Sequence, residues 1–298
     1  NSADTHILNV MPGGVGSAAF DGALGRSRPP GLFSFITGVV SFYTLTLSLL
    51  FSLIYGLKAN LYAKIIFSMA AIAMVVALPV SISRGMLASY LMVFTGLLLS
   101  LLLARIPLGR LLTGIAAIAA AVYFGTMIPA FQDTSVAFIA RWEGAGAVAG
   151  NDRSTEGDIG IASGQLSVRV LPGYLRPLQA LDHVPILGHG LGLGTNVGAQ
   201  RVTGQGFALG EGAWENTLGE LGPFLGLLFI GWRIALAFHL LRLSLDAAKR
   251  KNIIPLIILG GCFQPIISEQ IGTPTALGFL VLSTGLAFAS LRTDIKTV

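Results

Sequence analysis

Between residues 86 and 104 the chain reads MLASYLMVFTGLLLSLLLA, a stretch without a charged side chain. As a helix rising roughly 1.5 Å per residue, about 19 such residues cross the ~30 Å hydrocarbon core of a bilayer. Similar apolar stretches recur along the chain, at Phe33–Tyr55, Tyr62–Val80, Met86–Ala104, Leu111–Pro129, Pro223–Leu241, Ile253–Ile267 and Thr275–Leu291. They lack the alternation of a membrane β-barrel. The sequence therefore predicts an all-α integral membrane protein with about seven transmembrane helices.

The sixth stretch, Ile253–Ile267, differs from the others. It is shorter, and it contains Gly260, Gly261 and Pro265. Glycine weakens a helix and proline kinks it. We therefore expect this segment to be kinked or partly re-entrant.

Composition supports the membrane class. Of the 298 residues, 53% are hydrophobic and 11% are charged, whereas about a quarter of the residues in a soluble domain are charged. The net charge of +5 comes from Lys and Arg clustered between apolar stretches, a distribution that sets membrane orientation and argues against nucleic acid as a partner. Cys262 is the single cysteine, which excludes an intrachain disulfide and a cysteine-based metal site.

Alternate connections between the apolar stretches are basic, and the positive-inside rule makes those connections cytoplasmic. Residues 1–32, the turn at Arg84 and a long loop at 130–213 are then external, which in a Gram-negative cell means periplasmic. The predicted organisation is an external segment at 1–32, transmembrane helices at 33–129, a large loop of short helices at 130–213, and transmembrane helices at 214–298. The basic connections carry Lys58, Lys64, Arg105, Arg110, Arg242, Lys249, Arg250, Lys251, Arg292 and Lys296.

Arg84 lies in the turn Ser81–Gly85 (SISRG), which separates two apolar stretches with almost no connecting loop. An arginine in the hydrocarbon core costs roughly 2.5–3.5 kcal/mol on insertion scales, so such residues usually have a function or snorkel to the interface. We favour anion recognition, because the external turns otherwise avoid positive charge. A snorkelling anchor at a helix end is the alternative.

Two arginines of the long loop, Arg169 and Arg176, precede the turn Pro185–Gly192 (PILGHGLG), which contains His189. A guanidinium group matches phosphate oxygens and keeps its charge, although a solvated loop face explains either arginine equally well. The glycines resemble a dinucleotide-binding fingerprint only superficially, because no strand precedes them and no soluble helix follows.

The segment Trp214–Gly222 (WENTLGELG) stands where the long loop re-enters the membrane. Glu215 and Glu220 are the last carboxylates before a long apolar helix. A carboxylate at an apolar boundary favours its protonated form and suits a general base. Favourable charge near a helix N-terminus accounts for the same residues equally well.

No metal site is predicted. The four histidines, His6, His183, His189 and His239, are too scattered along the chain for zinc. The acidic residues near position 155 do not have the spacing of a calcium-binding EF-hand.

These features, in this order, resemble those of the O-antigen ligase and O-antigen polymerase superfamily of bacterial membrane glycosyltransferases. Together they span most of the chain. The matching features are Arg28–Phe33 (RPPGLF) before a helix, the Ser81–Gly85 turn, a loop arginine upstream of Pro185–Gly192, and Glu215-Asn216 followed by Leu218, Glu220–Gly222 and Gly226.

The resemblance implies a reaction in the bacterial inner membrane. Its donor substrate would be a glycan on undecaprenyl diphosphate, and its acceptor a second glycan or a glycolipid among the membrane lipids. The acceptor hydroxyl attacks the anomeric carbon and the lipid diphosphate leaves, without metal or cofactor. By position, the resemblance assigns catalysis to Glu215 and Arg84, diphosphate binding to Arg84, Arg169, Arg176 and Arg28, and secondary roles to Asn216, Glu220 and His189.

Three details refine this reading. Arg169 fits the family spacing slightly better than Arg176. Ligases of the family carry His-Asn where this chain has Glu215-Asn216, which shifts the expectation toward a polymerase or a less specialised polysaccharide enzyme. The family's larger number of helices implies further helices upstream of Asn1.

Two other functions compete with a glycosyltransferase. Some members of the same superfamily are labelled as bicarbonate transporters, so a transporter of a small anion is the second hypothesis. It requires ionisable residues near mid-membrane and paired broken helices, whereas the predicted helices are nearly free of charge and the arginines gather on one external face. A structural membrane subunit without activity is the third hypothesis.

Overall fold

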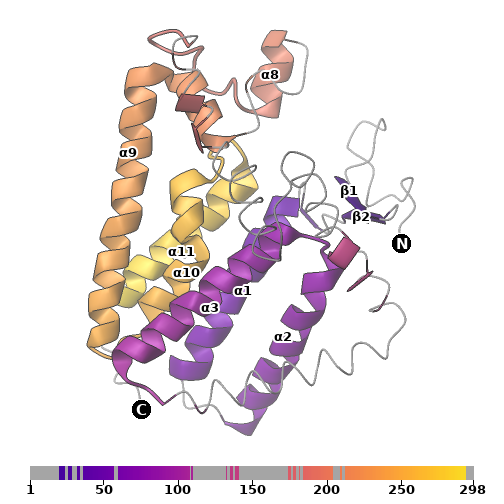
Figure 1. The fold of residues 1–298 in the computed structure, drawn as a ribbon, viewed down its shortest axis with the longest axis vertical. Helices are drawn as coiled ribbons and strands as arrows, with labels where there is room; N and C mark the ends of the chain where they lie inside the picture. The colour runs from indigo at the N-terminus through magenta and orange to yellow at the C-terminus, as the bar shows by residue number, and fades with distance from the viewer. Residues whose placement is uncertain are drawn as a thin grey trace, which may run out of the picture. The chain divides into compact units, whose positions relative to one another are not determined.

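The computed structural model describes residues 20–23, 26–28, 32–33, 36–56, 60–107, 109, 132, 135–136, 138–140, 174–175, 177–178, 181, 184–203, 209 and 212–292. Most of these residues are helical (Figure 1). The helices are α1 (Ile36–Gly56), α2 (Leu61–Val80), α3 (Arg84–Ala104), α8 (Asn196–Thr203), α9 (Ala213–Lys249), α10 (Ile254–Ser268) and α11 (Pro274–Leu291).

The apolar helices indicate a membrane protein. Five of them, α1, α2, α3, α9 and α11, are long and apolar enough to cross a bilayer, and α10 is a shorter apolar helix. All the predicted apolar stretches except Leu111–Pro129 coincide with a helix; that stretch lies outside the described residues. The sixth segment forms one helix, α10, of 15 residues that includes Pro265, and its kinked or partly re-entrant character stays a prediction.

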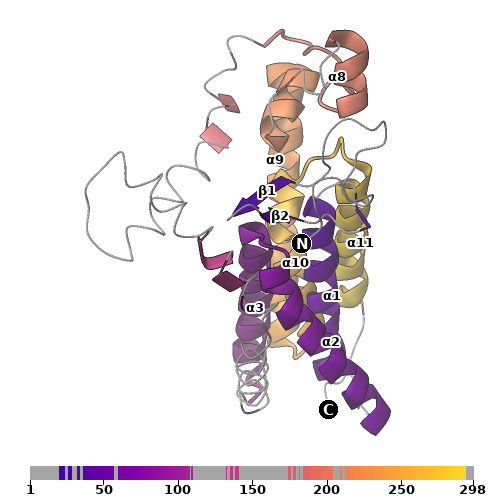
Figure 2. The ribbon, with the colours of Figure 1, turned by 90° about the vertical axis from the view of Figure 1, so that its right-hand side faces the viewer.

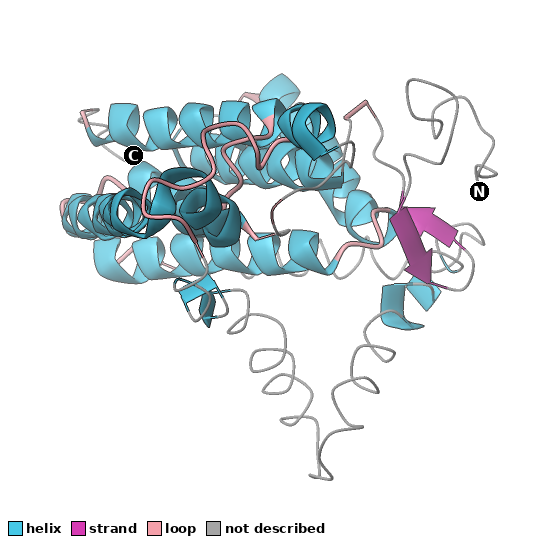
Figure 3. Cartoon of the chain, turned by 90° about the horizontal axis from the view of Figure 1, so that it is seen from above, coloured by secondary structure: helices cyan, strands magenta, loops and turns pink. Residues whose placement is uncertain are grey.

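A short β-hairpin precedes α1, which the sequence analysis did not predict. Strand β1 (Phe20–Ala23) pairs antiparallel with β2 (Arg26–Arg28), and Phe20 lies opposite Arg28. Figure 3 shows the two strands in magenta beside the helices. Arg28 is therefore the last residue of a strand.

The chain forms two compact units. The first comprises residues 1–142, 240–263 and 281–298, and the second comprises 143–239 and 264–280. The boundaries differ from the predicted linear domains because α9, α10 and α11 each contribute residues to both units.

The first unit is built around α1, α2, α3 and the first part of α10 (Figure 2). Its core contains Leu47, Met74, Leu97 and Ile257, one residue from each helix. Helices α3 and α10 meet backbone to backbone: a Cβ atom at Gly96 would lie 2.7 Å from the carbonyl oxygen of Leu256, and one at Gly260 would lie 2.7 Å from that of Met92. Small residues that allow such contacts are typical of helix pairs within membranes.

Basic residues gather at one end of this unit. The last turns of α1 and α3 pack near the first turn of α10, through contacts of Tyr55 and Ala104 with the core cluster that contains Ile253. The end of α11 is bound there too, since the Asn252 side-chain amide donates to the carbonyl oxygen of Ser290 at 2.9 Å. Clustered positive charge at helix ends is the distribution that the positive-inside rule describes, and Arg84, at the other end of α3, is the exception in this unit. The basic residues at these helix ends are Arg105, Arg250, Lys251 and Arg292.

The second unit contains the first part of α9, which is broken. Gly222 has φ 77° and ψ 172°, values outside the helical region, and Pro223 follows it. A glycine with positive φ ends a helix readily, and proline suits the first turn of the next one. A short helix from Ala213 thus leads into the long apolar helix, which begins at Pro223 as the sequence predicts.

Candidate functional site

The Pro185–Gly192 turn is bound to the break in α9. The backbone N–H of His189 donates to the carbonyl oxygen of Gly219 at 2.8 Å, and that of Gly190 donates to the carbonyl oxygen of Glu220 at 3.2 Å. The last carbonyl groups of a helix have no partner within the helix. Because the short helix ends at Gly222, the turn supplies the missing donors.

Two glycines make this contact possible. A Cβ atom at Gly188 (φ 71°) would collide with the carbonyl oxygen of Glu220, and one at Gly222 (φ 77°) would collide with that of Ile186. Both positions therefore combine a left-handed backbone with a close approach of two main chains, which only glycine tolerates without strain. The glycine run, superficially like a dinucleotide fingerprint, is a packing surface for α9.

The carboxylate of Glu220 fixes the same turn. Its Oε1 atom accepts hydrogen bonds from the backbone N–H groups of Gly192, at 3.1 Å, and Gly194, at 2.7 Å. Backbone N–H groups of successive loop residues form a concavity suited to an anion. Here the side chain of Glu220 fills that concavity, which gives the residue a structural role beside the secondary site role expected from the sequence.

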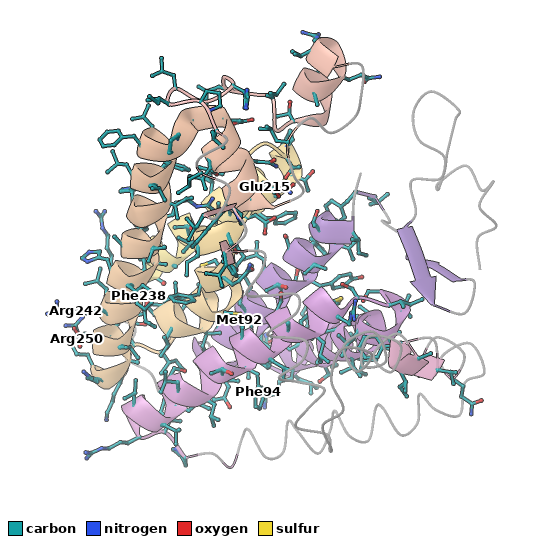
Figure 4. All side chains as sticks on the ribbon, turned by 45° about the horizontal axis from the view of Figure 1, so that its top comes forward. Met92, Phe94, Glu215, Phe238, Arg242 and Arg250 are labelled. Carbon is teal, nitrogen blue, oxygen red and sulfur yellow. The ribbon has the colours of Figure 1, made fainter. Side chains whose placement is uncertain are left out.

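Glu215 is exposed in the first turn of α9, and Figure 4 shows it near the opposite end of the helix from Arg242 and Arg250. The neighbouring Asn216 lies against Gly194, two residues after the Pro185–Gly192 turn. A Cβ atom at Gly194 would be 3.0 Å from the Asn216 Cβ. The Asn216 Oδ1 atom is buried and accepts no hydrogen bond from the described residues.

The turn that carries Arg84 is held by its two serines. Ser81 Oγ donates to the carbonyl oxygen of Leu78 at 2.8 Å near the end of α2, and Ser83 Oγ accepts from the Met86 N–H at 3.4 Å as the N-cap of α3. Ile82 between them is buried and has a positive φ of 46°. The residues Ser81, Ile82 and Ser83 thus form the whole connection between α2 and α3, and Arg84 is the first residue of α3.

The position of Arg84 is electrostatically unusual. A helix N-terminus carries a partial positive charge, so a cation there is disfavoured by about 0.3–1 kcal/mol, whereas an anion is favoured by a similar amount. Arg84 is half-buried at this position. A bound anion would offset the repulsion between the guanidinium group and the helix N-terminus.

The structure divides the predicted site residues between the two units. Arg28 and Arg84 belong to the first unit, and the second unit contains the others that are described. His189 is exposed. Arg169 and Arg176 lie outside the described residues, and for Arg28 the backbone alone is described. The structure brings together His189, Asn216 and Glu220 of the second unit, whereas Glu215 is exposed beside Asn216.

Sequence reasoning passed over Arg233, which lies inside the apolar stretch of α9. Its side chain is 3% exposed. Its Nε atom donates to the carbonyl oxygen of Ile266 at 2.6 Å, and its Nη2 atom donates to those of Pro265 at 2.9 Å and Glu269 at 3.0 Å. The signal was present in the sequence, because a charged residue within a predicted membrane helix marks a buried interaction.

The role of Arg233 follows from the shortness of α10. A helix of 15 residues is about 22 Å long, less than the ~30 Å hydrocarbon core. The last carbonyl groups of a helix lack partners within the helix. At the end of α10, Arg233 donates to the carbonyl oxygens of Ile266 and Glu269 and adds a second donor to that of Pro265, which also accepts from the Glu269 N–H at 2.9 Å. Trp214 donates from Nε1 to the carbonyl oxygen of Ile267 at 3.1 Å.

Glu269 follows α10 directly, in the turn toward α11. Burial raises the pKa of its carboxyl group above the ordinary value. A hydrogen bond from the backbone N–H of Gln270 and the positive charge of Arg233 lower that pKa and offset part of the effect of burial.

Within the part of the chain that the structure describes, no group of three or more His, Cys, Asp or Glu side chains is arranged to hold a metal ion. Comparison of the chain with protein-family models, with curated proteins and with solved structures finds no match.

Proposed function

We propose that this chain is a membrane glycosyltransferase that polymerises or ligates polysaccharide carried on a lipid diphosphate, at the periplasmic face of the bacterial inner membrane. One observation carries the proposal: the Pro185–Gly192 turn and the start of α9 form one hydrogen-bonded structure. Two motifs that are separate in the sequence are therefore joined in one structure, and the exposed Glu215 lies in the first turn of the same helix.

The proposed chemistry uses one carboxylate and one or more guanidinium groups. Glu215 accepts the proton of an acceptor hydroxyl as the hydroxyl oxygen bonds to the anomeric carbon of the donor glycan. The bond from that carbon to the diphosphate oxygen breaks, and the diphosphate leaves with the electron pair. Arg84 stabilises the charge that develops on the leaving group.

The transmembrane organisation of the proposal has seven spans. The basic helix ends face the cytoplasm, α10 makes a short crossing, and Leu111–Pro129 supplies the crossing between α3 and the long loop. This arrangement puts the Arg84 turn, the long loop and Glu215 on the same, periplasmic side.

The transport of a small anion remains the second candidate, and Arg233 favours it because it is an ionisable residue within a membrane helix. Its Nε and Nη2 atoms, however, are bound to main-chain carbonyl oxygens at the end of α10. A guanidinium group held in this way serves helix termination better than the binding and release of an ion.

The test compares purified variants in proteoliposomes that contain lipid-linked glycan, with polymer length and transfer as readouts. Arg84→Ala and Glu215→Gln are expected to lower the rate of glycan transfer at least 100-fold. Arg242→Ala is the matched control, because Arg242 is an exposed arginine of α9, and it is expected to leave the rate unchanged. Full transfer by both site variants would exclude the proposal, and anion flux into empty vesicles would establish transport instead.

A further inference from the structure

Helix α3 and the last part of α9, both in the first unit, end in the same kind of turn. In this turn, the Schellman motif, the N–H groups of two successive residues donate back to carbonyl groups three and five residues earlier. In both turns the first of the two residues has a left-handed backbone, with φ 54° at Arg105 and 67° at Lys251. A basic residue therefore stands where such turns usually have glycine. The bonds run from Arg105 N–H to Leu102, from Ile106 N–H to Leu101, from Lys251 N–H to Ala248 and from Asn252 N–H to Ala247, at 2.9 to 3.2 Å.

The left-handed backbone is costly for these two residues. In this conformation the Cβ atom of an L-residue comes too close to the following carbonyl oxygen, a repulsion that glycine escapes. The ordinary benefits of a basic residue do not require the conformation, since a cation anywhere in the last turn of a helix interacts favourably with the helix C-terminus. A cation anywhere in the connection also orients a membrane helix. The cost at Arg105 and Lys251 is explained if a cation at each place binds a ligand.

The two turns lie at one level of the unit. A Cβ atom at Gly260 would lie 2.7 Å from the carbonyl oxygen of Met92, and one at Gly96 would lie 2.7 Å from that of Leu256. Later residues of α3 thus meet earlier residues of α10, so the two helices run antiparallel and the end of α3 is level with the start of α10. Because Lys251 precedes that start by three residues, the end of α9 lies at this level too.

Two arginines add to the positive charge at this end. Arg250, which Figure 4 labels at the end of α9, precedes Lys251 directly. Arg292 follows α11, whose end is held here by the bond from the Asn252 side-chain amide to the carbonyl oxygen of Ser290. The four exposed residues of this basic cluster are Arg105, Arg250, Lys251 and Arg292.

An exposed apolar face of α3 leads to the cluster. Leu91, Leu99 and Leu102 are exposed, and at 100° per residue they fall within about a quarter turn of one another. This face ends at Arg105. An apolar strip that ends at a group of cations matches an anionic phospholipid, which has acyl chains and a charged headgroup. A soluble anion would use the cations alone. An acidic residue of α9, Asp246, is already paired with Lys249 at 3.2 Å.

We propose that the basic cluster binds the phosphate group of an anionic phospholipid of the surrounding leaflet, with an acyl chain of this lipid along the exposed face of α3. Guanidinium groups donate paired hydrogen bonds to phosphate oxygens, and the two hydrogen-bonded turns hold Arg105 and Lys251 at the level of the headgroup. The lipid stabilises the folded helix ends, because only the folded protein presents the cluster. This lipid site is independent of glycan transfer.

Unfolding midpoints in dodecyl maltoside micelles test the site. Phosphatidylglycerol added to the micelles is expected to raise the midpoint of the parent chain by about 3 °C more than phosphatidylcholine does, and high salt should reduce this difference through screening. Arg105→Gln removes the charge but keeps a side chain at the left-handed position, so it is expected to lower the affinity for phosphatidylglycerol about fivefold. Arg105→Lys, which keeps the charge, should retain most of the affinity.

Glycine variants separate the charge from the backbone cost. Arg105→Gly and Lys251→Gly are each expected to raise the midpoint in phosphatidylcholine by about 2 °C, because glycine relieves the left-handed conformation. Each should also lose part of the additional gain from phosphatidylglycerol. Arg201→Gln is the matched control, because Arg201 is an exposed arginine of α8 in the second unit. It is expected to leave the gain from phosphatidylglycerol unchanged.

Two sets of results would overturn the proposal. The first is an equal midpoint of the parent chain in the two lipids, or a gain from phosphatidylglycerol that the double variant Arg105→Gln with Lys251→Gln keeps in full. The second is a gain of the same size from inorganic phosphate or polyglutamate in phosphatidylcholine micelles, which would assign the cluster to a soluble anion or to an acidic protein segment.

Discussion

The guanidinium group of Arg233 terminates α10: its Nε atom donates to the carbonyl oxygen of Ile266 at 2.6 Å. The two residues are 33 positions apart in the sequence and lie on different helices. Side-chain termination of a helix is common at protein surfaces, where water is a ready alternative partner. Within a membrane protein's buried interior that alternative is missing, and Arg233, which is 3% exposed, becomes part of the framework.

Arg233→Met is therefore expected to destabilise the protein by about 3–5 kcal/mol, because it leaves buried carbonyl oxygens without donors. Arg233→Lys should recover part of the loss, since an ammonium group reaches fewer acceptors than a guanidinium fork. Unfolding by sodium dodecyl sulfate in mixed micelles measures the difference. Arg242→Met serves as the control, because Arg242 is exposed on the same helix. Equal stability of Arg233→Met and the parent would contradict this role.

Two substitutions of Glu220 test whether its side chain holds the turn at Gly192 and Gly194. Glu220→Gln keeps a side-chain oxygen that can accept from the N–H groups of Gly192 and Gly194, so we expect a small loss of stability. Glu220→Ala removes that acceptor and is expected to cost about 2 kcal/mol. Amide hydrogen exchange in residues 188–195 should rise in the alanine variant and stay near the parent level in the glutamine variant. Similar exchange in both variants would show that the carboxylate does not hold the turn.

Glycine substitutions separate backbone strain from steric contact. Gly188 and Gly190 both have positive φ, but a Cβ atom at Gly188 meets the Glu220 carbonyl whereas one at Gly190 meets open space. Gly190→Ala is expected to cost about 1–2 kcal/mol from conformation alone. Gly188→Ala should cost clearly more and detach the turn from α9. The midpoints of thermal unfolding in detergent rank the two variants, and a reversed order would contradict the contact.

The raised pKa of the Glu269 carboxyl group should make the stability of the protein depend on pH. Because the folded-state pKa of Glu269 is raised above that of the unfolded chain, the folded state binds the proton more tightly. The stabilisation that Glu269 contributes is therefore fully present at pH values below the pKa of the unfolded chain, which is about 4.3. It is lost as the pH rises through the pKa of the folded state. Glu269→Gln should flatten the pH profile of the unfolding midpoint in this range. A profile that this substitution leaves unchanged would assign the effect to another group.

The helices were predictable because the bilayer imposes a simple requirement, a long apolar stretch with internal hydrogen bonds, that each segment meets by itself. The start of the long part of α9 was predictable for a local reason too, since glycine weakens a helix and proline at the next position favours the first turn of a new one. The shortness of Ile253–Ile267 was visible in the sequence, whereas its continuity through Pro265 was not.

The features that sequence reasoning missed depend on partners far along the chain. Nothing near Arg233 in the sequence indicates that α10 ends beside it, and nothing near Glu220 indicates that Gly192 and Gly194 present their N–H groups to it. A carboxylate near the start of a helix has the same sequence pattern in three different roles. It can be a general base, a charge that interacts favourably with the helix N-terminus, or an acceptor of hydrogen bonds from a neighbouring turn. The tertiary contact decides between these roles.

The length of α10 has a consequence for the surrounding lipid. Neighbouring helices of 18 to 21 residues match a bilayer of ordinary thickness, whereas α10 has 15. Where such a helix meets acyl chains, the leaflet compresses by several ångströms or protein side chains occupy the missing height, at a cost of fractions of a kcal/mol per Å. Bilayers assembled from shorter acyl chains should therefore accommodate the molecule with the least deformation.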